Sequence, residues 1–258
     1  MDDHIAQSPG RLRASPLATL ATIVRDLVYP PSCAHCGIRI ARHGALCPEC
    51  WTSIRFIERP FCEVLGTPFP FDHGTAALSP EAIANPPAFD RLRSVATHDG
   101  IVRELVHSLK YRDRIDLAPV LARWMVRAGA PELAACDAVL AVPLHRTRLF
   151  TRNFNQSAEL ARHIARSTGK PFLAYTVLRV KRTARQVGLS ANARADNVRG
   201  AFAIGSGRDA DVFGRRLVLV DDVFTTGATV SAVAKVLKRA GAADVTVLTF
   251  ARALSDPI

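Results

Sequence analysis

The sequence predicts an α/β fold: a parallel sheet flanked by helices, with a small N-terminal zinc ribbon. Three observations support this prediction. From about residue 91 to residue 254, short apolar strands alternate with helix-like segments, a pattern typical of a parallel sheet covered on both faces. Two C-x-x-C pairs stand close together near the N-terminus. With 258 residues, of which 48% are hydrophobic, the chain is long enough to form a large core, which excludes a disordered protein.

Four segments are expected along the chain. Residues 1–28 form an N-terminal helix that ends before Pro30, and residues 29–56 form the cysteine ribbon. Residues 57–90 are a proline-rich connector with a short helix at 79–84, residues 91–254 are the main domain, and no internal repeat is found. In the main domain we predict strands at 93–97, 138–142, 177–180, 201–204, 217–220 and 245–250. We predict helices at 102–109, 117–126, 155–167 and 229–240.

The chain is basic, with a formal net charge of +11 and a pI near 10.0. Most of the excess lies in residues 143–199, where twelve Lys and Arg stand against two acidic residues. Such a field attracts anions, either a phosphorylated metabolite or nucleic acid, although a solvated helix face has the same composition. No apolar run reaches the roughly 18 residues that cross a bilayer, and the N-terminal apolar stretch has no signal-peptide cleavage site. We therefore expect a soluble, cytoplasmic protein that does not insert into a membrane.

The two C-x-x-C pairs, separated by ten residues, predict one structural zinc site. Each C-x-x-C turn directs two thiolates at one point, and two facing turns complete a tetrahedral site with sulfur about 2.3 Å from zinc. Four cysteines leave no open position for water, which indicates a structural rather than a catalytic metal. His35 and His43 lie in the same segment and remain alternative ligands, whereas Cys136 is expected to be a buried small hydrophobe. The predicted ligands are Cys33, Cys36, Cys47 and Cys50.

A second group of polar residues follows the apolar strand Leu217–Val220 and predicts a ribose phosphate site. Asp221 and Asp222 come first, and a Gly/Thr loop then opens a helix. In a parallel α/β sheet, ligands bind at the carboxyl ends of strands. The loop's N–H groups, hydroxyls and helix N-terminus suit a phosphate, whereas two carboxylates suit ribose hydroxyls or Mg²⁺. A simple helix cap needs only one acid. The predicted phosphate-binding residues are Thr225, Thr226, Gly227, Ala228 and Thr229.

These residues carry a resemblance to a known family. The stretch from Val218 to Thr229 resembles the 5-phosphoribosyl-1-pyrophosphate (PRPP) signature of type I phosphoribosyltransferases. From about Leu27 to the C-terminus, the chain resembles the ComF family, in which a cysteine zinc ribbon precedes such a domain. The chain departs from many relatives at Leu65, where a further C-x-x-C-Gly pair often occurs, so one zinc is expected and Cys62 is placed outside the site. The resemblance also rests on Tyr29-Pro-Pro-x-Cys33, Leu109-Lys-Tyr111, Pro143-Leu-His145, Asn153-Phe-Asn-Gln156 and Gln186-Val-Gly-Leu-Ser190.

The resemblance implies a role for each part of the site. Asp221 and Asp222 would contact the ribose of PRPP, and the threonine loop would hold the 5-phosphate. Residues 183–199, which are polar and lack helical periodicity, would form a mobile lid over the reacting centre. Arg185 in this lid would be a catalytic residue that neutralises pyrophosphate. The pyrophosphate-binding loop would comprise Pro143, Leu144, His145 and Arg146.

By the same resemblance, the chain is expected to be a phosphoribosyltransferase that binds PRPP with Mg²⁺ and displaces pyrophosphate from C1. Two alternatives stay open. One is an accessory protein of DNA uptake that binds single-stranded DNA, because relatives of the ComF family are associated with uptake of transforming DNA. The other is a sensor that binds PRPP without turnover. The basic segment 143–199 holds few aromatic side chains for base stacking, which favours phosphate binding over nucleic acid.

Overall fold

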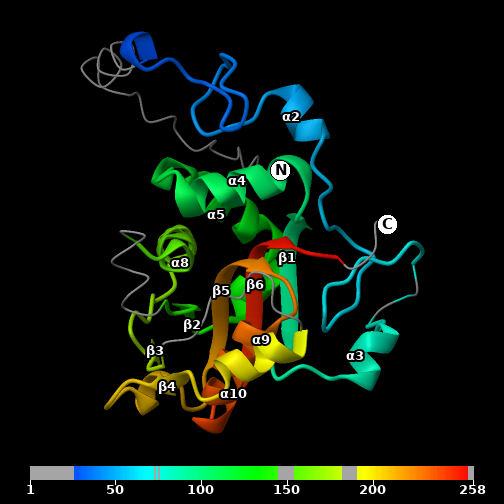
Figure 1. The fold of residues 1–258 in the computed structure, drawn as a ribbon, viewed down its shortest axis with the longest axis vertical. Coiled ribbons are helices and arrows are strands. Elements are labelled where there is room, and N and C mark those ends of the chain that lie inside the picture. Colours follow the sequence, from blue (N-terminus) through cyan, green and yellow to red (C-terminus); the bar gives the residue numbers. More distant parts are fainter. Residues whose placement is uncertain (1–25, 73, 75, 145–153, 182–190, 255–258) are drawn as a thin grey trace, which may run out of the picture.

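The computed structural model describes residues 26–254, apart from residues 73, 75, 145–153 and 182–190. At its centre lies a four-stranded sheet in the order β1-β6-β5-β2, with every pair parallel (Figure 1). Nearly every residue of the central strands is buried, as expected for parallel strands that are covered on both faces. The four strands are β1 (Arg91–Thr97), β2 (Ala138–Ala141), β5 (Arg216–Phe224) and β6 (Asp244–Arg252).

Helices cover both faces of the sheet because each presents an apolar stripe to it. One face packs against α4 (Gly100–Tyr111), η1 (Ile115–Leu117), α5 (Ala118–Ala128), α6 (Ala130–Ala135) and α8 (Gln156–Thr168). The other face packs against α9 (Ala191–Val198), α10 (Ala228–Arg239) and an antiparallel pair of short strands, β3 (Val177–Arg179) and β4 (Phe202–Ile204), which η2 (Asp209–Asp211) follows. None of the described helices combines the length and the apolar character needed to cross a membrane.

The predicted α/β order is confirmed, two local predictions are corrected and one helix is added. Strand β5 continues past the predicted end at Val220 because β6 keeps pairing with it, so that Asp221 lies opposite Thr249. The two acids therefore lie within the strand and not after it. Residues 191–198, which the sequence assigns to an aperiodic lid, form helix α9. Helix α6 was not predicted, because its six residues are too few to show a period.

The N-terminal region packs along the free edge of β1. The Ile57 N–H donates to the Val95 carbonyl at 2.9 Å, and the Leu92 N–H donates to the Val64 carbonyl at 2.8 Å. These bonds cover the backbone groups that an edge strand otherwise exposes. Two short helices belong to this region, α2 (Pro48–Thr52) and α3 (Pro80–Ala84). Figure 1 shows the part with α2 beyond α4 and α5, and the part with α3 beside the sheet.

Candidate functional site

The predicted phosphate loop joins the carboxyl end of β5 to the N-terminus of α10. Thr225 and Thr226 are exposed in this loop, and Gly227 adopts φ +72° before the helix starts. A Cβ atom at Gly227 would lie 2.7 Å from the Phe224 ring, and a residue with a side chain would be strained at this positive φ. Only glycine therefore fits here. The loop therefore places two hydroxyls beside a helix N-terminus, where N–H groups and the helix dipole favour an anion.

The two acids lie side by side but have different partners. Asp221 Oδ1 accepts hydrogen bonds from the Ser157 hydroxyl at 2.8 Å and from the Asp222 N–H at 2.9 Å. Asp222 forms an ion pair with Lys110 Nζ at 2.9 Å and is only 7% exposed. Two acids directly after an apolar run suggest an exposed strand end, and this expectation is wrong for Asp222. Because β5 runs on to Phe224, the sheet and α4 enclose its carboxylate.

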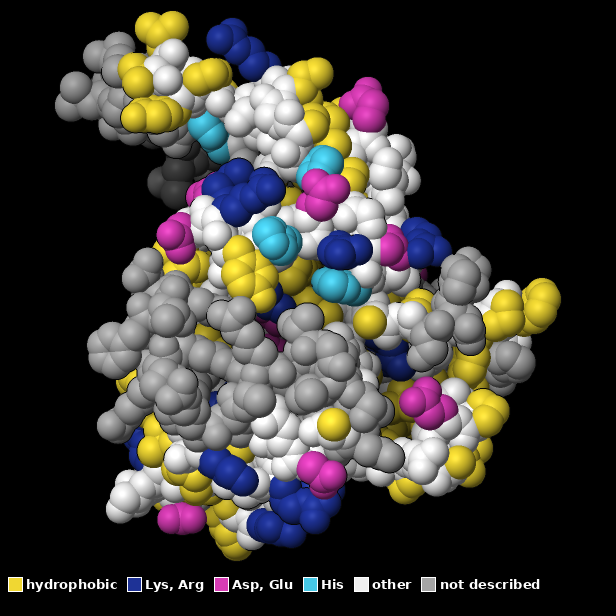
Figure 2. Space-filling view, viewed as in Figure 1, with side chains coloured by type: hydrophobic (Ala, Val, Ile, Leu, Met, Phe, Trp, Pro, Cys, Tyr) yellow, Lys and Arg dark blue, Asp and Glu magenta, His cyan; other side chains and the backbone are white. Residues whose placement is uncertain are grey.

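Burial and neighbouring charges shift the pKa values of this group of residues. Burial, followed by repulsion from Asp222, raises the pKa of Asp221 to about 7. Burial acts to lower the pKa of Lys110, but the attraction of Asp222 outweighs it and the net shift is upward. The pKa of His98 is lowered, first by burial and then by the charge of Lys110. Histidine, lysine and arginine side chains gather over α4 on the face shown in Figure 2, which favours an anionic ligand at this end of the sheet.

The loop after β2 starts next to the acids. Ala141 pairs with Val220, and the Val142 N–H donates to the Val220 carbonyl at 2.9 Å. The Asn155 side chain spans the base of the loop, because its amide donates to the Val142 carbonyl at 3.1 Å. The half-buried Pro143 and Leu144 thus leave the sheet beside Asp221. The remaining predicted site residues, His145, Arg146 and Arg185, lie outside the described residues.

Sequence reasoning did not assign two residues that the structure brings to the acids. Lys110 and Ser157 contact Asp222 and Asp221 from helices α4 and α8. Lys110 lies in a motif that supports the family resemblance, but a motif does not show which carboxylate it meets. In the sequence, Ser157 is only a polar residue in the first turn of a predicted helix, and this does not indicate a contact with Asp221. Both contacts join residues that are far apart in the sequence, so local patterns cannot reveal them.

The four predicted zinc ligands come together at the N-terminal end of the molecule. Their sulfur atoms all lie within 4.8 Å of one another, and the Cys36 and Cys47 sulfurs are 3.7 Å apart. Four sulfurs at about 2.3 Å from one zinc ion would be about 3.8 Å apart, so the cluster fits the metal. Burial acts to raise the pKa of Cys33, but N–H donors such as that of Cys47 bring it down to about 6, whereas burial and the neighbouring cysteines raise the pKa of Cys50.

The two histidines of the ribbon have other partners. His35 Nδ1 lies 3.3 Å from the Cys50 sulfur, and its Nε2 lies 3.0 Å from a carboxylate oxygen of Glu104. His43 pairs with Asp26 at 2.8 Å. Of the alternatives left open by the sequence, the arrangement therefore favours four cysteines as ligands, with His35 in contact with one of them.

The local geometry of the ribbon recurs in residues that the sequence assigns to a connector. The Cys33 N–H donates to the Ile38 carbonyl at 2.8 Å, and the Cys62 N–H donates to the Thr67 carbonyl at the same distance. The glycine after each turn, Gly37 or Gly66, has a positive φ and donates its N–H back to the first cysteine. The statement that the sequence contains no internal repeat is therefore corrected: the chain contains two ribbon halves of similar backbone geometry.

The second ribbon half lacks the means to bind zinc. Its Ser79-Pro-Glu-Ala82 stretch begins α3 in the way that Cys47-Pro-Glu-Cys50 begins α2. Among the four positions equivalent to zinc ligands, only Cys62 keeps a thiol, and its sulfur accepts the Ser79 N–H at 3.2 Å. All four side chains at these positions are buried. They are Cys62, Leu65, Ser79 and Ala82.

Models of two protein families match the chain. A double zinc ribbon domain matches residues 24–82, and a phosphoribosyl transferase domain matches residues 155–257. Among solved structures, the B. subtilis glutamine PRPP amidotransferase is 24% identical, with a TM-score of 0.35 over 50% of this chain and 25% of that one. This chain thus spans about a quarter of the amidotransferase. The protein TT1426 from Thermus thermophilus is 17% identical, with a TM-score of 0.34 over 55% of this chain and 85% of that one.

Several curated relatives match nearly the whole chain. The DNA utilization protein YhgH of Salmonella typhi is 34% identical over 88% of this chain and 100% of its own length. YhgH of Escherichia coli K12 is 32% identical with the same coverage. Competence protein F of Haemophilus influenzae is 30% identical over 86% of this chain and 96% of its own length. Since both domains and nearly the full length of these relatives are matched, the chain belongs to the ComF family.

Proposed function

We propose that the carboxyl end of β5 binds PRPP or a related ribose phosphate together with Mg²⁺. The observation that carries this proposal is the adjacency of two acids, a Gly/Thr loop and a helix N-terminus at one strand end. The loop and the first turn of α10 bind the 5-phosphate. Asp221 and Asp222 accept hydrogen bonds from the ribose hydroxyls, and their oxygens are also of the type that Mg²⁺ prefers.

Lys110 and Ser157 act as positioning residues in this proposal. Lys110 neutralises Asp222 while the site is open, so ligand hydroxyls that approach Asp222 do not meet a bare buried charge. Ser157 fixes the orientation of the Asp221 carboxylate through its hydrogen bond. When the ligand binds, ribose hydroxyls or Mg²⁺ replace part of the contacts that the two acids make with Lys110 and Ser157. The affinity for the ligand should therefore depend on both residues.

The reaction that this site supports is transfer of the phosphoribosyl group. A lone pair of the acceptor forms a bond to C1 of PRPP, the bond from C1 to the pyrophosphate oxygen breaks, and pyrophosphate leaves with the electron pair. Bound Mg²⁺ supplies charge neutralisation for the leaving group. In this proposal the loop after β2 contacts pyrophosphate through Pro143, Leu144, His145 and Arg146. Arg185 stabilises the departing pyrophosphate, and the site holds the two reactants in the orientation that the reaction needs.

Calorimetric titration with PRPP and Mg²⁺ tests the site. Thr226→Val should weaken both PRPP and ribose 5-phosphate, because both carry the 5-phosphate. Arg185→Ala should weaken only PRPP, because ribose 5-phosphate has no pyrophosphate. Unchanged PRPP binding by a folded Asp221→Asn variant would contradict the proposed site. Release of pyrophosphate over time, measured with candidate acceptor bases, separates an enzyme from a sensor that binds PRPP without turnover.

A second proposal, that the protein handles single-stranded DNA in the cytoplasm, is supported by the relatives named for DNA utilization and competence. The basic segment 143–199 offers the charge for such binding. None of the six cysteines, all of which the structure describes, forms a disulfide, which suits a reducing compartment. Binding through this segment should be independent of sequence and should weaken steeply with added salt. Tight binding that salt barely changes would contradict it.

A further inference from the structure

Arg252, the last residue of β6, is a buried arginine without an acidic partner among the described residues. It is only 5% exposed. Its guanidinium donates to two neutral acceptors of the second ribbon half, the Leu65 carbonyl and, at 2.9 Å, the Thr67 hydroxyl. Within the part of the chain that the structure describes, its Nε has no hydrogen-bond partner. Burial lowers the pKa of Arg252, and the opposing effects of Glu81 and Cys62 do not compensate for it.

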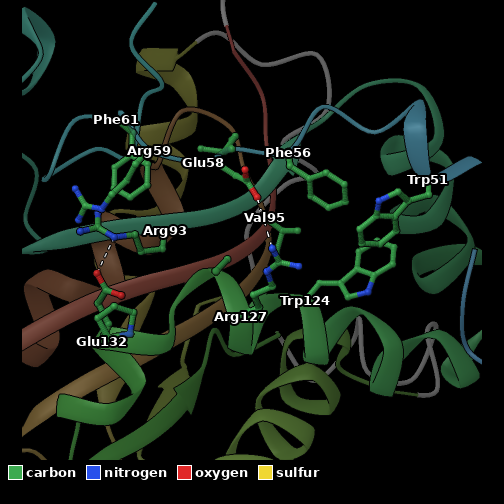
Figure 3. A pocket seen from close by; sticks show the side chains of 13 residues that line it. Trp51, Phe56, Glu58, Arg59, Phe61, Arg93, Val95, Trp124, Arg127 and Glu132 are labelled. Atoms are coloured by element: carbon green, nitrogen blue, oxygen red, sulfur yellow. Dashed lines mark ion pairs between the residues drawn. The ribbon is translucent and has the colours of Figure 1, made fainter. Parts of the chain in front are cut away.

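A second buried arginine shows the usual compensation. Arg93 on β1 is 4% exposed, and its guanidinium pairs with Glu63 and with Glu132, both at 2.7 Å. Figure 3 shows its side chain extending toward Glu132. Arg93 also binds the second ribbon half, because it donates to the Glu63 carbonyl at 2.9 Å. A buried charge without a partner is costly, so the lack of an acid at Arg252 needs an explanation that Arg93 does not.

Arg252 lies close to the proposed phosphate loop. It pairs with Phe224 across the sheet, and its guanidinium carbon lies 5.1 Å from the centre of the Phe224 ring. The same ring lies against Gly227, where a Cβ atom would be 2.7 Å from it. A single aromatic ring therefore separates the buried charge from the turn that begins α10.

The N-terminus of α10 adds to the positive potential at this turn. The helix has no side-chain cap, so the N–H groups of its first turn and the helix dipole leave partial positive charge there. The buried guanidinium contributes a full charge from the protein side, where salt and water screen it little. Two positive groups this close repel each other, and an anion at the loop would offset both.

We propose that Arg252 is a positioning residue for the 5-phosphate and that the second ribbon half holds it in place. Its charge acts from behind the Phe224 ring and raises the affinity of the loop for a dianion. The hydrogen bonds to Leu65 and Thr67 keep the guanidinium beside the ring. The ribbon half that lacks zinc ligands thereby supports the phosphate site. This inference rests on the proposed binding of a ribose phosphate at β5.

Calorimetric titration with ribose 5-phosphate tests the charge of Arg252. Arg252→Gln keeps N–H donors for the ribbon half but removes the charge, and affinity should fall about tenfold. Arg252→Met suits the apolar surroundings, provides a second uncharged variant and should show the same loss. Arg252→Lys keeps the charge and should stay within about threefold of the parent. In the Arg252→Gln variant, PRPP should lose affinity by the same factor, whereas pyrophosphate, which lacks the 5-phosphate, should bind as in the parent.

Two control variants separate position from net charge and from the ribbon contact. Arg216→Met removes one positive charge at the opposite end of β5 from the loop, and it should leave the titration with ribose 5-phosphate unchanged. Thr67→Val removes one acceptor of the second ribbon half while Arg252 stays charged. It should weaken ribose 5-phosphate about twofold, because the guanidinium is held less firmly. Denaturant titrations establish that each variant is folded.

The outcomes distinguish this inference from the proposed function. A folded, uncharged Arg252 variant that binds ribose 5-phosphate as tightly as the parent would overturn the role of Arg252 and leave the β5 site intact. Equal losses in Arg252→Gln and Arg216→Met would indicate net charge instead of position. Loss of pyrophosphate binding in Arg252→Gln would indicate a general disturbance of the fold. Unchanged affinity in Thr67→Val would remove the ribbon half from the inference. A parent protein that binds neither ribose 5-phosphate nor PRPP would overturn the proposed function itself.

Discussion

The affinity for PRPP with Mg²⁺ should rise with pH because of Asp221. Burial and the neighbouring Asp222 raise the pKa of this carboxyl to about 7, so it is mostly protonated at pH 6. Accepting ribose hydroxyls or contacting Mg²⁺ requires the ionised form. If the ligand holds Asp221 fully ionised in the complex, affinity should increase about tenfold between about pH 6 and pH 8, because the ionised fraction rises from about one eleventh to about ten elevenths.

Folding stability should respond to the same carboxyl with the opposite sign. Asp221 has a folded pKa of about 7 against an ordinary value of 3.8, so the folded protein keeps a proton that the unfolded chain releases. This proton favours the folded state at low pH, and its contribution is lost as pH rises from about 4 through 7. Asp221→Asn removes the titrating group and should flatten this part of the stability profile.

Calorimetric titration of the parent and of Asp221→Asn at pH 6, 7 and 8 measures the binding effect. Titration of the phosphates of PRPP contributes equally to both proteins, so the difference between the two profiles belongs to Asp221. Ser157→Ala provides a second check. In the parent, the Ser157 hydroxyl lowers the pKa of Asp221. Without this hydroxyl the pKa should be higher, so the rise in affinity should move to higher pH. Parallel profiles for the parent and Asp221→Asn would refute the reasoning.

Three further predictions concern the metal and the buried ion pair. The protein should carry about one zinc per chain, and Cys47→Ser should lose it in metal analysis; full retention would disprove the four-cysteine site. Asp222→Asn should lower the free energy of unfolding by about 3 kcal/mol because Lys110 loses its buried partner. Adding Lys110→Met should recover part of that loss in denaturant titrations, whereas additive losses would show that the pair is not coupled. Zinc content should rise to about two per chain when cysteines complete the second ribbon half at Leu65, Ser79 and Ala82.

Much of the main domain follows from local patterns in the sequence. Apolar runs such as Leu217–Val220 indicate buried strands, and the four-residue spacing of Val230 and Ala234 on α10 indicates a helix. The zinc ligands are found in the same way, because two C-x-x-C turns are short and self-contained. Where the pattern is weak, prediction fails: α9 is a helix of small and polar residues without an apolar stripe.

The environment of the acids could not be predicted, because it depends on contacts between distant parts of the chain. Ser157 reaches Asp221 across 64 positions of sequence, and Lys110 reaches Asp222 from an even more distant part of the chain. Adjacent acids after an apolar run suggest the exposed end of a strand. Here β6 extends β5 by backbone pairing, and no side-chain pattern in β5 alone reveals how long its neighbour is.

The sequence revealed only the first turn of the second ribbon half, at Cys62 and Leu65, and the rest of the repeat was missed for a different reason. Sequence comparison looks for the chemically distinctive residues, and the second half has replaced three of the four ligands. What persists is the backbone requirement. Gly66 still has a positive φ, and a Cβ atom there would lie 2.5 Å from the Leu92 carbonyl oxygen. Ser79-Pro-Glu still begins a helix, since Pro is favoured in the first helical turn whether or not a metal ligand precedes it.

The different packing of the two ribbon halves explains why one keeps the metal site and the other does not. Cys62, Leu65 and Ala82 belong to one of the two large hydrophobic cores of the main domain. The side chain of Arg252 ties this half further to β6 by donating to the Leu65 carbonyl and, at 2.9 Å, to Thr67. Burial of apolar surface can therefore hold the turn without zinc.

The first half has less support of this kind, although Ala34 and Leu46 pack against the core of the main domain. Its three buried cysteines form a separate small cluster, with only Ile40, Leu46 and Ile101 packed against it among the described residues. Metal binding must then supply most of its folding free energy. Removal of zinc with a chelator should disorder this half while the second half and the sheet stay folded. Because Trp51 follows the ligand Cys50 directly, its fluorescence should change on chelation well before the main domain unfolds, and a single transition common to both would contradict this division.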